Sequence, residues 1–295
     1  MTDTCNRAPG PGREVNRPNA EFSVHGDAYR MQRRPGSRHL VVNDGNSGVL
    51  VIEPSTGQEI ARVAVPRKDV DAGLVEWWYF SDDGRMMAVQ DERGTLTLIP
   101  LVSSVPSAVR SVELGIPQRG WPYLWDESLI LADDHFRFLE IAFDGHTVQV
   151  VARPSVEIRR KHVRWRAALD RLPAGSTILR VSPDDGSLVY ANSLEPPSIL
   201  GILRWAGDLP EWSIPVPIDT AKSATYGDRL FVLHEESIDG WTSTGMNYMS
   251  FSPPAEFQFR DVDIIPGHET VAPMLAALCS SRDQAKADLI ATYTL

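Results

Sequence analysis

Short runs of hydrophobic residues, separated by turns rich in Gly, Pro, Asp and Asn, recur along almost the whole chain. Between residues 38 and 65, three such runs, HLVVND, VLVIEP and EIARVAV, are separated by GNSG and STGQ. Short β-rich runs bounded by residues that favour tight turns are typical of strands joined as hairpins. The pattern predicts an antiparallel meander here and a second one, of four strands, between residues 75 and 114.

The spacing of these units indicates the architecture. The second strand of each unit serves as a marker, and successive markers lie about 42 to 58 positions apart, a period typical of propeller repeats. The turn before the marker also recurs, as SDDGR at 81–85 and SPDDGS at 182–187. We therefore predict an all-β propeller with six blades, with seven as the alternative. The markers begin near Arg38, Met86, Leu129, Ser187, Arg229 and Met274.

The two ends of the chain are predicted to meet in one blade. The last unit supplies only about three strands, and a spare strand near residues 21–25 precedes the first unit. Pairing of the two would complete the last sheet and remove an exposed edge. Residues 1–20, rich in Arg, Pro, Gly and Asn, are expected to form a flexible leader, and residues 21–295 a single propeller domain.

Several segments resemble repeats of the WD40-like or YVTN-like β-propeller superfamily. They are HLVVNDGNSGVLVIEPSTGQEIARV at 39–63 and the turn segments SDDGRMMAV and PDDGSLVYA. The resemblance implies a propeller fold. True WD40 repeats close their third strand with Trp-Asp, whereas the Trp-Asp pair of this chain, at residues 125–126, precedes a marker strand.

One interval between markers is longer than the others and contains residues 157–172. Apolar residues recur there at steps of three and four, and most remaining positions are Arg or Lys. This spacing predicts a helical insertion with one apolar stripe, although a pair of irregular strands is the alternative. Arg160, Arg164 and Arg166 are candidate contacts for an acidic partner. The competing interpretation is that they face water or pair with carboxylates of the chain itself.

Aromatic residues gather in the predicted innermost strands of the second and third units. Amphipathic rings near the axis could stack on a ligand, with an acidic side chain and an imidazole supplying polar contacts. The competing interpretation is that large side chains fill the wedge between neighbouring blades. The candidate residues of this site are Glu76, Trp78, Trp121, Tyr123, Trp125 and His268.

Charge and composition narrow the classes of function. The chain of 295 residues carries 29 basic and 39 acidic side chains, a formal net charge of −10. Such a negative field opposes the binding of a polyanion, so we expect no specific nucleic-acid partner. The longest uncharged apolar stretch, 271–279, is far below the roughly 20 residues that a membrane-spanning helix needs, so no membrane partner is expected. Cys5 and Cys279 are expected to be an exposed thiol and a core residue, which favours a reducing, cytoplasmic compartment.

Local motifs do not favour catalysis. The acidic and histidine residues at 133–135, 234–239 and 268–269 lack the spacing of a metal site, so no metal and no cofactor are expected. Residues 45–48, GNSG, lie in a predicted hairpin rather than on a strand-to-helix turn. We therefore expect a non-catalytic scaffold that binds a protein partner in a bacterial cytoplasmic assembly. The alternative is a small-molecule hydrolase or lyase with its site in the central opening of the propeller.

Overall fold

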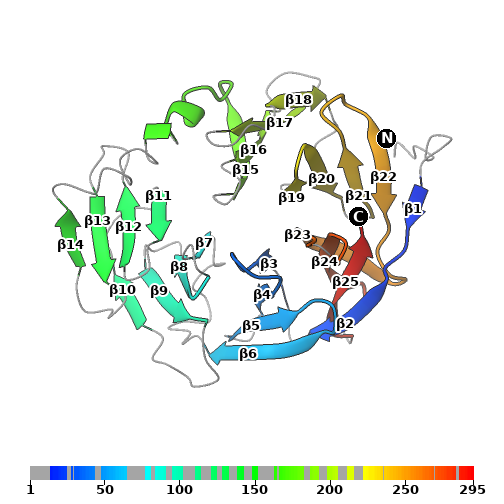
Figure 1. Cartoon of the computed structure of the whole chain (residues 1–295), viewed down its shortest axis with the longest axis horizontal. Helices are drawn as coiled ribbons and strands as arrows, with labels where there is room; N and C mark the ends of the chain where they lie inside the picture. Colours follow the sequence, from blue (N-terminus) through cyan, green and yellow to red (C-terminus); the bar gives the residue numbers. More distant parts are fainter. Residues whose placement is uncertain are drawn as a thin grey trace.

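Short strands dominate the structure, and they are arranged as sheets around a common axis (Figure 1). Within each sheet, strands that follow one another along the chain pair antiparallel. The computed structural model describes residues 14–24, 28, 30–43, 48–64, 77–80, 84–90, 95–101, 110–113, 121–124, 128–132, 138–142, 148–151, 163–164, 166–182, 187–192, 198–204, 211–215, 222–234, 236–268, 270–283 and 286–295.

The described strands form six sheets, which we number along the chain. Sheet 1 contains β3 (Arg30–Arg33), β4 (Leu40–Asn43), β5 (Gly48–Glu53) and β6 (Gln58–Ala64). Sheet 2 contains β7 (Trp77–Phe80), β8 (Met86–Gln90), β9 (Thr95–Pro100) and β10 (Arg110–Glu113). Sheet 3 contains β11 (Trp121–Leu124), β12 (Ser128–Ala132), β13 (Phe138–Ala142) and β14 (Val148–Val151).

The remaining sheets follow the same order. Sheet 4 contains β15 (Ser176–Ser182), β16 (Ser187–Asn192), β17 (Ile199–Arg204) and β18 (Trp212–Pro215). Sheet 5 contains β19 (Ser223–Tyr226), β20 (Arg229–Leu233), β21 (Ile238–Trp241) and β22 (Asn247–Phe251), with β1 (Glu14–Asn16) as a fifth strand. Sheet 6 contains β23 (Phe257–Ile265), β24 (Met274–Ser281) and β25 (Asp288–Thr294), with β2 (Ala20–Val24) as its fourth strand.

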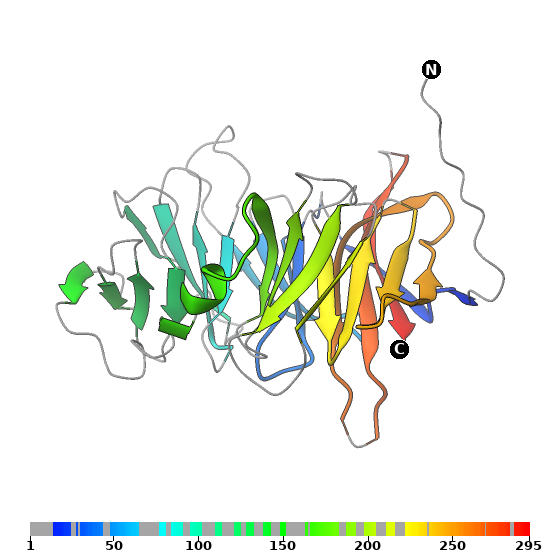
Figure 2. The same ribbon diagram turned by 90° about the horizontal axis from the view of Figure 1, so that it is seen from above.

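The first strand of each meander lies nearest the axis (Figure 1). Figure 2 shows the sheets from the side, as one layer with a hairpin projecting from it. Radial sheets around one axis are the arrangement of a β-propeller. The predicted all-β propeller is therefore confirmed.

The hydrophobic core lies between neighbouring sheets, as β24 illustrates. Leu275 and Ala277 belong to a buried cluster shared with sheet 5, while Ala276 and Leu278 belong to one shared with sheet 1. A strand covered on both faces needs apolar residues at successive positions rather than at alternate ones. This explains the continuous apolar run of β24. Comparable buried clusters join sheet 1 to sheet 2 and sheet 4 to sheet 5.

The N-terminal segment pairs with two different sheets. β2 pairs antiparallel with β25, with Ala20 opposite Thr292 and Val24 opposite Asp288. This is the pairing that the sequence predicts for the stretch near residues 21–25. β1 pairs parallel with β22, which places it beside a different sheet.

The predicted flexible leader of residues 1–20 is therefore too long. Residues 14–16 form a strand, and the backbone N–H of Asn19 donates to the carbonyl oxygen of Thr292 at 2.7 Å. Composition suggested a leader because the segment has few apolar side chains. Main-chain hydrogen bonding to a sheet edge does not require such side chains. Residues 1–13, with Cys5, lie outside the described residues.

A helical segment lies between β14 and β15, inside the predicted insertion 157–172. Residues 163–164 and 166–169 are helical, whereas residues 157–162 lie outside the described part of the chain. The segment covers the face of sheet 4 that is turned away from sheet 5. Two residues of the predicted apolar stripe, Leu169 and Leu172, take part in this packing. The cluster consists of Ala168, Leu188, Tyr190 and Leu203, with Leu169 and Leu172 packed against it.

Candidate functional site

Two buried aspartates connect the innermost strand of sheet 6 to that of sheet 1. Asp261 and Asp263 alternate along β23 with residues that pack toward sheet 5, so their carboxylates are turned toward sheet 1. Oδ2 of Asp261 accepts a hydrogen bond from the backbone N–H of Met31 at 2.9 Å. Oδ2 of Asp263 accepts one from the backbone N–H of Arg33 at 2.7 Å. The carboxylates thus satisfy two donors on an edge of β3 that has no paired strand on this side.

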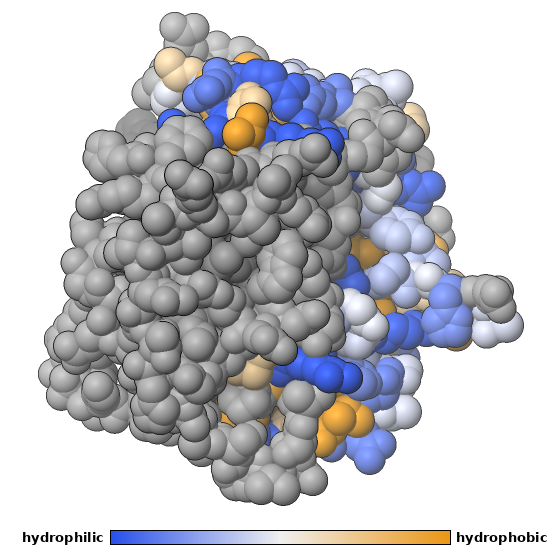
Figure 3. All heavy atoms as spheres, turned by 60° about the vertical axis from the view of Figure 1, so that its left-hand side comes forward, coloured by the Kyte–Doolittle hydropathy of each residue, from blue (hydrophilic) through white to orange (hydrophobic). Residues whose placement is uncertain are grey.

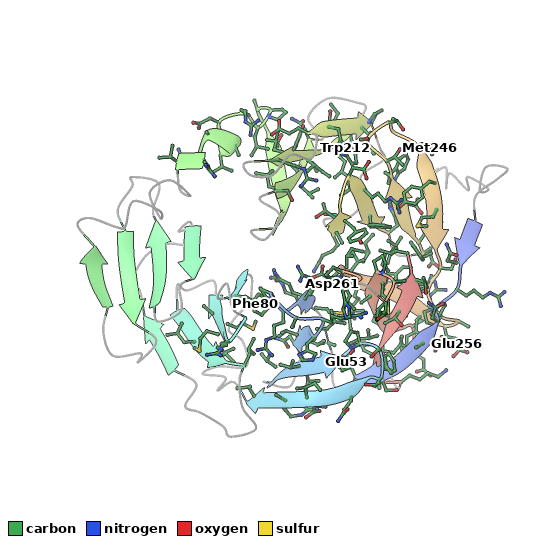
Figure 4. The ribbon with its side chains drawn as sticks, viewed as in Figure 1. Glu53, Phe80, Trp212, Met246, Glu256 and Asp261 are labelled. Carbon is green, nitrogen blue, oxygen red and sulfur yellow. The ribbon has the colours of Figure 1, made fainter. Side chains whose placement is uncertain are left out.

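Each carboxylate has further partners. Oδ1 of Asp261 accepts from the backbone N–H of Val262 at 2.9 Å, and Oδ1 of Asp263 from that of Ile264 at 2.7 Å. Nζ of Lys222, the residue before β19, lies 3.3 Å from Oδ2 of Asp261. Figure 4 shows Asp261 near the axis of the ring. Asp261 therefore connects sheets 5, 6 and 1.

These aspartates were not among the residues singled out from the sequence. The available signal was the run FRDVDII at 259–265, in which two acidic residues alternate within an otherwise apolar strand. Buried charges require specific partners, so such a pattern indicates carboxylates that are held by hydrogen bonds.

The same contacts define one face of the ring. β3 and β23 run in the same direction, because residue numbers increase together along the two strands. Met31 bonds to Asp261, and Arg33, two residues further along, bonds to Asp263. Nε of Arg34, just after β3, donates to the carbonyl oxygen of Gly84, just before β8, at 2.7 Å. The turns that follow the innermost strands of sheets 6, 1 and 2 therefore emerge on one face. We call it the hairpin face; its described turns include 34–39, 84–85 and 266–273.

Gly84 is required at this junction. Its φ of 67° lies in the left-handed region, and a Cβ at this position would lie 2.4 Å from the carbonyl oxygen of Pro35. Glycine alone combines this backbone conformation with so close an approach. The contact between the turns of sheets 1 and 2 thus depends on the sequence SDDGR recognised as a repeated turn.

The hairpin between β23 and β24 projects from the hairpin face (Figure 2). At its end, the backbone N–H of His268 donates to the carbonyl oxygen of Val271 at 3.0 Å, and that of Val271 to the carbonyl oxygen of His268 at 2.6 Å. The C-terminal residue supports its base, because the N–H of Leu295 donates to the carbonyl oxygen of Pro273 at 3.1 Å. His268 is exposed, and Val271 is 38% exposed.

The turn 34–39 lies beside the base of this hairpin. Arg33, which enters the turn, is bonded to Asp263, two residues before β23 ends. Nε2 of His39 lies 3.6 Å from Oε2 of Glu53. Among the described residues, Nε and Nη2 of Arg38 are shielded from solvent and have no hydrogen-bond partner. Arg38 was not a candidate from the sequence; the basic cluster RRPGSRH at 33–39 was the available signal.

The structure describes the strand positions of some residues of the predicted aromatic site. Trp78 lies in β7, and Trp121 and Tyr123 lie in β11; these innermost strands are neighbours, as predicted. Glu76 and Trp125 lie outside the described residues. His268 lies beyond the end of β23 on the hairpin face, whereas Trp78 lies near the start of its strand, at the other face. The structure therefore places His268 at the opposite end of the innermost strands from Trp78.

The basic segment 163–172 packs on sheet 4, and an ion pair of Arg171 joins it to that sheet. Nη1 of Arg171 lies 2.7 Å from Oε1 of Glu211, and Nη2 of Arg171 donates to the carbonyl oxygen of Arg204 at 2.6 Å. Arg164 is exposed and Arg166 half-buried, while Arg160 lies outside the described residues. Figure 3 brings this side of the molecule forward: among its coloured atoms, hydrophilic surface surrounds a small hydrophobic spot at the top of the view, and a second hydrophobic area lies near the bottom.

The acidic and histidine residues at 234–239 take part in ordinary protein contacts. Oδ1 of Asp239 accepts from the hydroxyl of Ser250 at 2.9 Å, and the carboxylate of Glu236 pairs with Arg282. In the described ranges, no group of three or more His, Cys, Asp or Glu side chains is arranged to hold a metal ion. The described part of the chain contains no helix whose length and apolar character would let it cross a membrane.

Comparison with known proteins supports the fold. No family model and no curated protein matches the chain. Among solved structures, it is similar to the β-propeller domain of Cps50 (Swd1) from Myceliophteria thermophila, with a TM-score of 0.58, 12% sequence identity and coverage of 96% of this chain and 100% of that one. It is also similar to Raptor from Chaetomium thermophilum, with a TM-score of 0.56, 11% identity and coverage of 95% of this chain and 29% of that one. The chain therefore has a WD40-like β-propeller fold.

Proposed function

We propose that this chain is a protein-interaction scaffold of a bacterial cytoplasmic assembly, and that it binds its partner through the hairpin face. In this proposal the six sheets are the complete set of blades, and pairing of β2 with β25 closes the ring. The observation that carries the proposal is a structured hairpin that projects from a WD40-like propeller and presents exposed side chains at its end.

The energetics of the ring suit a scaffold. Buried clusters join sheets 4 to 5, 5 to 6, 6 to 1 and 1 to 2, and the two aspartates of β23 add hydrogen bonds between innermost strands. A body held in this way fixes the positions of its surface turns. Turns that are already fixed lose little conformational entropy when they bind, which favours recognition of a partner surface.

The experiment uses the full chain as bait in cell lysate from the source bacterium, followed by purification of the complex. We expect one partner to be retained in a fixed stoichiometry and to co-elute with the full chain on size-exclusion chromatography. The purified partner should then bind the purified chain with a measurable Kd. A chain that elutes alone after incubation with lysate, with no protein retained above empty resin, contradicts the scaffold function.

A further inference from the structure

We infer that the projecting hairpin and Arg38 form one docking surface for a partner protein that offers an apolar recess with a carboxylate beside it. The inference rests on the scaffold function proposed above and specifies the chemistry of the partner. Two independent observations carry it: the preorganised apolar end of the hairpin, and an arginine whose carboxylate-binding edge has no partner within the described chain.

The described residues that flank the hairpin end are joined to each other before any partner binds. The reciprocal backbone bonds between His268 and Val271 close it, and Pro266 and Pro273, whose φ angles are fixed by their rings, flank it. The bond from Leu295 to the carbonyl oxygen of Pro273 anchors its base to the C-terminus. An element ordered in this way binds without the entropic cost of folding a loop.

Recognition at the hairpin end depends on side chains. The backbone N–H groups of His268 and Val271 each donate to the carbonyl oxygen of the other residue, so they are not available to add a strand from a partner. Val271 is among the few large hydrophobic side chains that are exposed in the described part of the chain. A convex, rigid element with an apolar side chain at its end fits a recess on a folded partner. Burial of that side chain in the recess supplies the hydrophobic part of the interaction.

Arg38 supplies the polar part. Its Nε and Nη2 form the edge of the guanidinium that carries two parallel N–H donors; in the unbound chain this edge is shielded from solvent and has no acceptor among the described residues. A carboxylate engages this edge with two parallel hydrogen bonds, a geometry that gives both strength and specificity. A buried donor without an acceptor destabilises the free protein. A partner carboxylate that draws this edge outward therefore binds with a more favourable free energy than it would at an arginine that already has an acceptor.

The two parts are close enough to contact one partner. The backbone of Arg33, at the start of the turn that carries Arg38, is bonded to Asp263. Leu40, which follows the turn, belongs to the same buried cluster as Ile265, and Met274 packs against that cluster. β23 ends at Ile265 and β24 begins at Met274, so the turn of Arg38 adjoins the base of the projecting hairpin.

The first test uses a dicarboxylate, sodium glutarate, as the probe. We expect a saturable change of the Arg38 Nε–H resonance and, at a concentration about ten times Kd, a melting temperature about 2 to 4 °C higher than in sodium chloride of equal ionic strength. Arg38→Met removes both responses without lowering the melting temperature of the free protein, because no described hydrogen bond is lost. Arg62→Met, which removes an exposed ion pair with Glu59 on β6, is the matched control and keeps both responses.

Three results of this test would overturn the carboxylate site. The first is a glutarate response no greater than that of chloride. The second is a response that Arg38→Met retains. The third is a saturable response to inorganic phosphate with none to glutarate, which would assign the arginine to a phosphorylated partner instead.

The second test uses the purified partner from the scaffold experiment. We expect Val271→Asp and Arg38→Met each to weaken its binding about tenfold, as for residues at the centre of an interface. Ile60→Asp, at an exposed apolar position on β6, is the control and should change the Kd less than about threefold, as expected for a residue outside the contact. Unchanged binding by both variants of the docking surface overturns the inference and leaves the scaffold function standing. Absence of any partner for the wild-type chain contradicts the scaffold function itself.

Discussion

The carboxylate of Asp263 accepts a hydrogen bond from the backbone N–H of Arg33, with 2.7 Å between Oδ2 and N, although 230 positions separate the two residues in the sequence. The bond joins the innermost strand of the last sheet to that of the first described meander. Together with the equivalent bond from Met31 to Asp261, it connects sheets that share no strand pairing. These bonds stabilise the contact between sheets 6 and 1 near the axis of the ring.

Replacing Asp263 by alanine should destabilise the fold. The substitution leaves the N–H groups of Arg33 and Ile264 without their acceptor in a buried site. Loss of such charge-assisted bonds costs about 2 to 3 kcal/mol. The melting temperature should fall by about 5 to 10 °C in a calorimetric scan. Asp228→Ala, at an exposed turn position, serves as the control; equal melting temperatures for the two variants would contradict the structural role of Asp263.

Stability should decrease at alkaline pH. Burial raises the pKa of the Cys279 thiol and of the Tyr293 phenol well above their usual values. In the unfolded chain these groups lose their protons near about pH 8.5 and 10, whereas the folded chain keeps both protons to higher pH. The unfolded state then binds fewer protons, so the free energy of unfolding falls as pH rises above these values.

Urea denaturation at several pH values checks this expectation. The midpoint should be constant between about pH 7 and 8 and should fall progressively above the unfolded pKa of cysteine. Cys279→Ala should make the urea midpoint less dependent on pH near pH 9, because it removes the group that titrates first in the unfolded chain. A urea midpoint that stays constant up to about pH 10.5 would contradict the expectation, because it would mean that folding does not raise the pKa of either group.

Gly201 is predicted to be indispensable for the packing of Tyr190. The two residues are opposite each other on β17 and β16, and a Cβ on Gly201 would lie 2.4 Å from Cζ of the tyrosine ring. Gly201→Ala would displace this ring from the cluster below Ala168 and should cost about 1 to 3 kcal/mol, as overpacked core sites do.

A double-mutant cycle measures this coupling. Tyr190→Leu removes the ring, so Gly201→Ala should cost much less in that background than in the wild-type chain. Additive losses in the free energy of unfolding would show that the alanine acts through something other than the tyrosine ring.

Deletions at the N-terminus test whether β2 closes the ring. Removal of residues 1–13 should leave the melting temperature unchanged within about 2 °C, since it removes no described strand. Removal of residues 1–26 deletes both β1 and β2; loss of β2 exposes the edge of β25 and removes the buried side chain of Val24. We expect that deletion to lower the melting temperature by about 10 °C or to cause aggregation, because an open strand edge pairs with other chains. Equal melting and a monomeric profile for both deletions would contradict closure by β2.

The sequence predicted what depends on neighbouring residues. Strand-forming runs and turn residues are local, so β4 to β6 of sheet 1, the meander of sheet 2 and the helical residues within 163–169 could be predicted before any contact was known. The repeated turn sequences and their period indicated the propeller, because equal units can bury their faces only against each other. Pairing of β2 with the last strand followed from counting the strands of an incomplete unit.

The leader and the site were harder to predict. β1 was assigned to a flexible leader because its side chains are mainly polar, yet its backbone pairs with β22. His268 was assigned to a site near the axis, but β23 is nine residues long and extends beyond its neighbours into the projecting hairpin. The length of a single hairpin is not contained in the period of the repeat.

By itself, then, the sequence determined most of the strands, the turns and their grouping into meanders, since each arises from properties of adjacent residues. The partners of Asp261 and Asp263, the isolation of the Arg38 donors and the face on which His268 emerges were decided only when distant segments packed together. A hydrogen bond between β23 and β3 requires two backbones to be within about 3 Å, and nothing in either segment specifies the other.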